Sequence, residues 1–301
     1  MTIGRFYHTA SVLANGKVLV AGGNGYDANG YRSYLSSSEL YDPETGIWTK
    51  TGNMSAIRYD HTASVLANGK VLVAGGHGYD GYGSWGPLYS SELYDPATGI
   101  WTKTGNMTVG RSCHTASVLV NGKILVASGD GYDGYYYWGL LNSSELYDPA
   151  TGIWTKTGNM NIERRYHTAS VLTDGKVLVA GGYRTGGYSY GENLNSTELY
   201  DPTTGNWTKA ANMNIGRRYH TASVLADGKV LVAGGCIYNG YSCEDLNSAE
   251  LYDPSTGLWI QTANMAVRRE GHTASVLPSG KVLVTGGYTG SGISSSAELY
   301  Q

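Results

Sequence analysis

The sequence is poor in several kinds of residue, and each shortage excludes a class of protein. Three cysteines among 301 residues are too few for a disulfide scaffold, and seven prolines do not fit a disordered linker. A net charge of −3 offers no basic surface for nucleic acid, and no apolar run approaches the roughly 20 residues that span a membrane. We therefore expect neither nucleic acid nor a membrane as a partner.

Motifs of common enzymes are missing as well. No Gly-x-Ser-x-Gly, His-Glu-x-x-His or P-loop pattern occurs in the sequence. We therefore predict a protein that is not an enzyme, with no catalytic residue, no metal ligand and no cofactor.

The few cysteines leave two readings open. Cys236 and Cys243 lie in one short loop, where they either close a small disulfide or remain two unpaired thiols.

Asn-x-Ser/Thr sequons, which are acceptors for glycosylation, occur at Asn53, Asn106, Asn142, Asn195 and Asn206. Together with the low charge they lean towards an extracellular location, although the sequence does not settle the compartment.

One block, His-Thr-Ala-Ser-Val-Leu followed by a turn and Gly-Lys, recurs six times along the chain. Its histidines are spaced 53, 53, 53, 53 and 52 residues apart, at His8, His61, His114, His167, His220 and His272. A repeat of this length is typical of propellers and solenoids. We predict a single domain over residues 1–301, with repeats that start near residues 1, 54, 107, 160, 213 and 265.

The fourth copy shows what one repeat folds into. Residues 167–172 and 176–180 read as two strands joined by an Asp-Gly turn, and the second strand is almost wholly apolar. After a loop rich in Gly and Tyr, residues 196–200 and 206–209 read as two more strands joined by an Asp-Pro-Thr-Thr-Gly turn. Four antiparallel strands in about 50 residues make one propeller blade.

Three features recur at fixed places in these repeats. A glycine pair closes the second strand at Gly22-Gly23, Gly75-Gly76, Gly181-Gly182, Gly234-Gly235 and Gly286-Gly287, with Ser128-Gly129 departing in the third copy. A tyrosine ends the third strand at Tyr41, Tyr94, Tyr147, Tyr200, Tyr252 and Tyr300. A tryptophan follows at Trp48, Trp101, Trp154, Trp207 and Trp259. In these features the whole chain resembles the kelch repeat, which implies an all-β, six-bladed kelch β-propeller with four antiparallel strands per blade.

The sixth repeat has no Trp strand, so we expect the last blade to lack its fourth strand. Either this chain is a fragment of a longer parent whose further residues supply that strand, or a three-stranded blade is tolerated. In the first case the blade exposes a strand edge, through which the chain would associate with itself.

Strand order puts the Gly- and Tyr-rich loops on one face of the propeller and the short turns on the other. The short turns are nearly identical between copies, whereas the loops differ and hold most of the tyrosines. Variable loops on a rigid scaffold usually carry function. We therefore predict that ligands bind the loop face, through loop residues Trp85, Tyr135, Tyr136, Tyr137 and Trp138.

The two residues before each repeat histidine also vary, and we expect them to surround the mouth of a central channel. The candidates among them are Tyr59, Asp60, Arg165, Tyr166, Arg218 and Tyr219. Arg165 and Arg218 would make one side basic, and Asp60 and Glu270 the other side acidic. His77 directly follows a glycine pair, Asp130 follows the corresponding Ser128-Gly129, and both are further polar candidates.

An arginine stands three residues before each repeat histidine, at Arg5, Arg58, Arg111, Arg164, Arg217 and Arg269. Such regularity indicates structure first. We expect each Arg to bond loop carbonyls or a neighbouring blade, and each repeat His to satisfy a buried polar group. In kelch proteins that bind acidic peptides, arginines at such positions bind the carboxylates of the peptide. The resemblance implies that some of the arginines in this chain also have that role.

Taken together, the sequence predicts a non-catalytic scaffold that binds a protein or peptide through the Tyr-rich loop face. Tyr and Trp supply rigid amphipathic contact area for such recognition. A lectin-like propeller that binds a glycan on the same face is the alternative. The segment around His220 is also similar to the galactose-oxidase-like copper radical oxidases, where such a histidine binds copper; that is the third reading. Because this histidine recurs in every repeat, its presence says nothing about copper.

Overall fold

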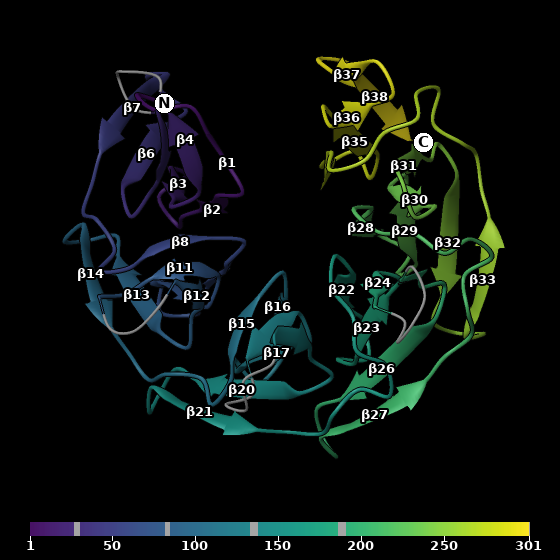
Figure 1. Cartoon of the computed structure of the whole chain (residues 1–301), viewed down its shortest axis with the longest axis horizontal. Helices are drawn as coiled ribbons and strands as arrows, with labels where there is room; N and C mark the ends of the chain where they lie inside the picture. The colour runs from purple at the N-terminus through teal and green to yellow at the C-terminus, as the bar shows by residue number, and fades with distance from the viewer. Residues whose placement is uncertain (27–30, 82–84, 133–137, 186–190, 301) are drawn as a thin grey trace. The chain divides into compact units, whose positions relative to one another are not determined.

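A computed structural model describes residues 1–26, 31–81, 85–132, 138–185 and 191–300 (Figure 1). Every regular element among them is a β-strand, as predicted from the repeat. None of these residues forms a helix long and apolar enough to cross a membrane. The chain is divided into two compact units, Met1–Thr157 and Gly158–Gln301. A single domain over residues 1–301 stays a prediction.

The first unit contains three four-stranded antiparallel sheets, one for each of the first three repeats. The first sheet is β2 (Thr9–Val12), β3 (Val18–Ala21), β6 (Ser38–Asp42) and β7 (Ile47–Lys50). The second is β9 (Thr62–Val65), β10 (Val71–Ala74), β13 (Ser91–Asp95) and β14 (Ile100–Lys103). The third is β16 (Thr115–Val118), β17 (Ile124–Ala127), β20 (Ser144–Asp148) and β21 (Ile153–Lys156). Within each sheet the strands follow one another in chain order.

The second unit repeats this plan. Its first sheet is β22 (Thr168–Val171), β23 (Val177–Ala180), β26 (Thr197–Asp201) and β27 (Asn206–Lys209). Its second is β28 (Thr221–Val224), β29 (Val230–Ala233), β32 (Ala249–Asp253) and β33 (Leu258–Gln261). Its third has only β34 (Thr273–Val276), β35 (Val282–Thr285) and β38 (Ala297–Tyr300). The predicted all-β fold with four antiparallel strands per repeat is confirmed, and the last sheet of the described chain lacks a fourth strand as expected.

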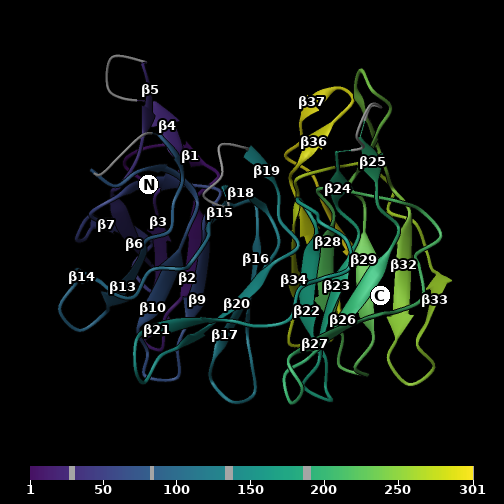
Figure 2. The same cartoon turned by 60° about the horizontal axis from the view of Figure 1, so that its bottom comes forward.

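The Gly- and Tyr-rich segments, expected as loops, form short hairpins instead. In the first unit each hairpin forms a small sheet with a short strand before the repeat histidine. The first joins β4 (Asn24–Tyr26) and β5 (Arg32–Tyr34) to β1 (Arg5–Phe6), and the second joins β11 (His77–Tyr79) and β12 (Gly86–Pro87) to β8 (Ile57–Tyr59). The third joins β18 (Asp130–Tyr132) and β19 (Trp138–Leu140) to β15 (Gly110–Ser112). In the second unit they are β24 (Tyr183–Arg184) with β25 (Glu192–Asn193), β30 (Cys236–Tyr238) with β31 (Cys243–Asp245), and β36 (Tyr288–Thr289) with β37 (Gly292–Ile293). In each unit these hairpins lie at one end of the large sheets (Figure 2).

Consecutive sheets pack through the residues that define the repeat. Leu19 of the first sheet packs with Val71, Tyr94 and Trp101 of the second. The Trp101 indole donates a hydrogen bond to the Gly52 carbonyl oxygen at 3.0 Å, in the segment that joins the two sheets. Burying an aromatic side chain of this size contributes about 2 kcal/mol or more. The Tyr and Trp of the second, third and fifth repeats are therefore fixed by packing between sheets.

Each repeat arginine is buried and forms an ion pair with the glutamate of the third strand in its own repeat. The pairs, with N–O distances of 2.7–3.0 Å, are Arg5–Glu39, Arg58–Glu92, Arg111–Glu145, Arg164–Glu198, Arg217–Glu250 and Arg269–Glu298. Each arginine also donates to carbonyl oxygens of its repeat; Arg58, for example, reaches the Gly75 and Ser90 oxygens. The expected bonds to loop carbonyls are confirmed, so these arginines hold the hairpin segment to the sheet.

The repeat histidines join consecutive repeats. His61 Nε2 lies 3.0 Å from Thr9 Oγ1, and His114 Nε2 lies 2.9 Å from Thr62 Oγ1. In the second unit His220 meets Thr168, and His272 meets Thr221, in the same way. These four contacts give the histidine of one block and the threonine of the preceding block a structural role, as predicted.

Gly75, the first glycine of the second pair, has no room for a side chain. Its φ is +61°, and a Cβ there would meet the Arg111 carbonyl oxygen at 2.4 Å. Gly75→Ala is expected to lower the free energy of unfolding by about 2–5 kcal/mol, from left-handed backbone strain and overpacking together. Gly16→Ala is the matched control, because Gly16 has φ +79° but nothing within 4 Å. Urea denaturation of both variants measures the difference, and equal losses would contradict the close packing at Gly75.

Candidate functional site

The residue directly before each repeat histidine adopts a left-handed backbone. We call these six the rim residues: Tyr7, Asp60, Cys113, Tyr166, Tyr219 and Gly271. Their φ values lie between +52° and +58°, although only Gly271 is a glycine. Left-handed backbone costs a non-glycine residue about 1–2 kcal/mol, and such strain tends to persist at functional sites. The rim is therefore the first place to seek a ligand.

Backbone hydrogen bonds connect neighbouring rim residues within each unit. Asp60 N donates to Tyr7 O at 3.2 Å, and Cys113 N donates to Asp60 O at 3.1 Å. In the second unit Tyr219 N donates to Tyr166 O at 3.3 Å, and Gly271 N donates to Tyr219 O at 2.9 Å. The left-handed turn orients the backbone N–H and C=O groups of the rim residues towards the neighbouring repeat. These hydrogen bonds hold successive rim residues side by side.

An aromatic cluster lies beside the rim of the first unit. It consists of Tyr34, Tyr59, His77 and Trp85. Ring centroids are 5.4 Å apart between Tyr34 and Tyr59, 4.6 Å between Tyr34 and Trp85, and 5.2 Å between Tyr59 and His77. The last contact follows from strand pairing, because His77 of β11 is opposite Tyr59 of β8. Tyr34 and Trp85 remain 36% and 38% exposed, so the cluster offers a surface.

Two carboxyl groups accompany this cluster. Burial raises the pKa of Asp60 to about 6, the Cys113 thiol acts against this by hydrogen bonding, and the negative charge of Asp130 adds to the rise. Asp130 is opposite Ser112 in the pairing of β18 with β15, one residue from Cys113. Predicted residues Tyr59, Asp60, His77, Trp85 and Asp130 thus fall in one region, with aromatic surface next to negative charge.

In the second unit arginines and tyrosines alternate. We call this group the arginine–tyrosine stack: Arg165, Tyr166, Tyr183, Arg218, Tyr219 and Tyr238. The Arg218 guanidinium lies 4.8 Å from the Tyr183 ring centroid and 4.7 Å from that of Tyr238. Arg165 lies over Tyr166 and Tyr183 at 4.9 and 5.4 Å. Such cation–π contacts contribute about 0.5–2 kcal/mol each, which fixes both the charges and the rings.

The predicted division into a basic and an acidic side does not hold within the second unit. The Glu270 carboxyl lies within electrostatic reach of Arg218, whose positive charge acts to lower the pKa of Glu270. Arg218 of the basic side and Glu270 of the acidic side are therefore neighbours, because their repeats are consecutive and share the rim.

Some predicted residues are not placed, and others were missed. Tyr135, Tyr136 and Tyr137 lie outside the described residues, and Trp138 is described only as the first residue of β19. Tyr34, Tyr183 and Tyr238, which complete the aromatic cluster and the arginine–tyrosine stack, were not predicted from the sequence. Their position beside the rim depends on the hairpin pairing, which the irregular loop sequences do not indicate.

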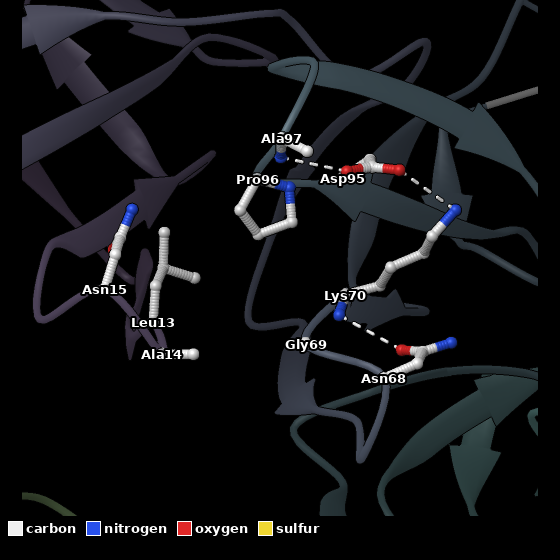
Figure 3. Close-up of a pocket in the computed structure, with 9 residues that line it drawn as sticks. All are labelled: Leu13, Ala14, Asn15, Asn68, Gly69, Lys70, Asp95, Pro96 and Ala97. Carbon is white, nitrogen blue, oxygen red and sulfur yellow. Dashed lines mark hydrogen bonds and ion pairs between the residues drawn. The ribbon is translucent and has the colours of Figure 1, made fainter.

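The opposite, short-turn face of the first unit has a shallow pocket (Figure 3). It is lined by the turns Leu13–Asn15, Asn68–Lys70 and Asp95–Ala97. Lys70 Nζ pairs with Asp95 Oδ2 at 3.1 Å, and the Ala97 amide donates to Asp95 Oδ1 at 2.9 Å. Because these polar groups already bind one another, the pocket offers a ligand little beyond shape.

Comparison with known proteins places the chain among repeats of the same kind. The kelch motif model matches residues 5–55 and 58–108, and the Attractin/LZTR1 beta-propeller model matches residues 131–295, more than half of the chain. Kelch-like protein 15 of Danio rerio is 29% identical over 271 residues, 82% of this chain and 41% of the relative. Kelch-like protein 23 of Homo sapiens is 29% identical over 85% of this chain and 42% of the relative. Alpha-scruin of Limulus polyphemus is 27% identical over 99% of this chain and 32% of the relative. The chain spans less than half the length of each of these proteins.

Proposed function

The chain belongs to the kelch-repeat β-propellers, and from this premise we propose that it is a non-catalytic module that binds a protein or peptide on its hairpin face. The observation that carries the proposal is the exposed aromatic surface of Tyr34 and Trp85 beside the strained rim. Tyr, Trp and Arg dominate the residues that supply binding energy at protein interfaces. Here all three are held in fixed positions, so a partner would meet them with little loss of side-chain entropy.

The two groups favour different parts of a partner. The aromatic cluster lies next to Asp60 and Asp130, which favours an apolar or basic side chain. The arginine–tyrosine stack presents Arg165 and Arg218, which favour a carboxylate through paired N–H donors. A peptide with an aromatic or basic anchor would use the first unit, and an acidic segment would use the second.

Two alternatives remain as proposals of other classes. Tyr34 and Trp85 beside Asp60 also suit a glycan, whose sugar rings stack on aromatic faces while carboxylates accept bonds from hydroxyls. A copper radical oxidase is the weakest alternative. The Nε2 atoms of His61 and His114 are already bonded to threonines, so these rings lack a free Nε2 for copper.

The proposal is tested by selecting peptides from a random display library on the immobilised protein and measuring their affinity. The double variant Tyr34→Ser with Trp85→Ser is expected to bind them at least about tenfold more weakly, since an aromatic anchor contributes about 2 kcal/mol. The control is Ile47→Ser with Ile100→Ser, which removes two side chains of 56% exposure beside the short turns. If only a glycan array gives ligands that the double variant loses, the glycan alternative is correct. Ligands that neither variant affects would contradict the choice of face.

We also propose, as a separate interaction, self-association through the edge of β38, which pairs with β35 alone among the described strands. A hollow of about 280 Å³ beside this strand is lined in part by Leu231, Met265, Glu298 and Tyr300. Unpaired strand edges favour pairing with another chain. Leu299, which is half exposed on β38, is the residue to change. Leu299→Lys is expected to convert concentration-dependent dimers to monomers in sedimentation experiments, and a wild-type chain that stays monomeric throughout would contradict the proposal.

A further inference from the structure

A disulfide closes one hairpin of the second unit. Cys236 and Cys243 are bonded, with their Cα atoms 5.6 Å apart, across strands β30 and β31. Cys236 is opposite Asp245, and Tyr238 is opposite Cys243. Residues directly opposite each other in antiparallel strands have side chains on the same face, and so do residues two apart in one strand. Both sulfurs and the Asp245 carboxyl are therefore on one side of this hairpin.

A second carboxyl group reaches the same place from the next repeat. The sulfurs of Cys236 and Cys243 and a carboxylate oxygen of Glu270 all lie within 4.8 Å of one another. Glu270 is held there by backbone bonds to Tyr288 in both directions. Its Oε2 atom is buried and has no hydrogen-bond partner among the described residues.

Two carboxyl groups therefore accompany the two sulfurs. Asp245 is buried, and the Oε2 atom of Glu270 is buried as well. Carboxyl oxygens that are withdrawn from water are stabilised either by protons or by a bound cation. Two sulfurs beside them make the donor set suitable for a metal that accepts both sulfur and oxygen.

We propose that this cluster is a redox-gated zinc site, in which reduction of the disulfide frees Cys236 and Cys243 to bind Zn²⁺ together with Glu270. Asp245, on the same side of the hairpin, is a candidate for a fourth ligand. Zn²⁺ usually takes four ligands in a tetrahedral arrangement, and water can be one of them. The oxidised form has no thiolate to offer and does not bind zinc.

The chemistry balances without any further reactant in the protein. A dithiol reductant transfers two hydrogen atoms to the Cys236 and Cys243 sulfurs, and its own two sulfurs join in a disulfide. Zn²⁺ then replaces the two thiol protons, which pass to solvent. Arg218 Nη2 lies 3.4 Å from the Cys243 sulfur and favours its thiolate form.

The test uses the full chain with Cys113→Ser, which removes the one thiol outside the disulfide, and Co²⁺ as a spectroscopic probe for zinc. Protein reduced with a phosphine, which does not compete for metal as a thiol would, is expected to bind one equivalent of Co²⁺. The complex should show thiolate-to-cobalt charge-transfer absorption, and Zn²⁺ should abolish that absorption. The oxidised protein should show no such absorption.

Variants separate this site from adventitious binding. Cys236→Ser with Cys243→Ser is expected to remove the absorption, and Glu270→Gln to weaken Co²⁺ binding at least about tenfold. Thermal unfolding gives a second readout, since Zn²⁺ should raise the Tm of the reduced protein but not of the oxidised one. Absence of the charge-transfer absorption in the reduced protein, or an affinity unchanged by Glu270→Gln, would overturn the proposal. Both outcomes are independent of peptide binding.

Discussion

Arg58→Met is expected to lower the free energy of unfolding by about 3–5 kcal/mol, because it leaves the buried Glu92 carboxylate without its partner. Arg58 is fully buried and bonds Glu92 Oε1 at 2.9 Å. It also donates to the Gly75 and Ser90 carbonyl oxygens at 2.7 and 3.0 Å. Burial lowers the pKa of Arg58, and the Glu92 charge opposes that shift. The variant therefore leaves one buried charge and two carbonyl oxygens without the partner that Arg58 supplied.

The control for this prediction is an exposed ion pair of the same sheet. Lys70 and Asp95 lie 3.1 Å apart with both side chains about one-third exposed, so Lys70→Met should change stability by less than about 1 kcal/mol. Adding Glu92→Gln to Arg58→Met should recover part of the lost free energy of unfolding, because Gln carries no charge. Its side-chain oxygen can still accept the hydrogen bond that the Ser55 backbone N–H donates to Glu92 Oε2 at 2.7 Å. Urea denaturation gives all three values. A loss at Arg58 no larger than that at Lys70 would show that the buried pair contributes no more than a surface one.

The sheets were predicted well from the sequence because every repeat shows the same pattern of apolar strands and turn residues. The apolar strand Val71–Ala74 is fully buried, the Asn68-Gly69 turn precedes it, and the Asp95-Pro96 turn joins β13 to β14. The sequence also predicted that Arg58 is structural, since the arginine never varies. It did not predict Glu92 as the partner, because each repeat holds several acids and only the strand register brings this one to the arginine.

The binding surface was predicted only in part, for a physical reason. Tyr166 and Tyr219 were chosen from their place before the repeat histidine, and their rings lie 4.2 Å apart. Tyr183 and Tyr238 were not chosen, because their approach to Arg218 depends on hairpins whose sequences show no strand alternation. One signal of the left-handed rim was present, in that Gly271 stands where the other five repeats have side chains.

Acid is expected to destabilise both units through the repeat histidines. Burial, followed by the charge of the neighbouring arginine, lowers the pKa of His61 and His220 to about 3 and that of His272 to about 4. The same causes lower the pKa of His114 well below its ordinary value. In the unfolded chain these groups titrate near 6.5, so below that pH the unfolded state binds more protons. Stability is therefore lost as pH falls from 6.5 towards the folded pKa values.

The expected loss is large because several histidines act in the same direction. Each contributes at most about 1.4 kcal/mol per pH unit, or about 2 kcal/mol between pH 6.5 and 5. Groups such as Asp60, whose pKa is raised by burial to about 6, have the opposite sign and offset part of this. The urea midpoint should accordingly fall steeply between pH 7 and 5.

A single substitution distinguishes the histidines from other acid effects. His61→Gln replaces the ring that contacts Thr9 Oγ1 at 3.0 Å with an amide, which does not titrate. The slope of the free energy of unfolding against pH should therefore fall by about 1.4 kcal/mol per pH unit. Lys17→Gln, which removes a partly exposed cation from the first repeat, should leave the slope unchanged. A His61→Gln slope equal to that of the wild type would mean that the acid sensitivity arises elsewhere. If the slope falls as expected, the contact that joins one repeat to the next is also what limits the fold to neutral pH, because it requires an uncharged ring in a buried place.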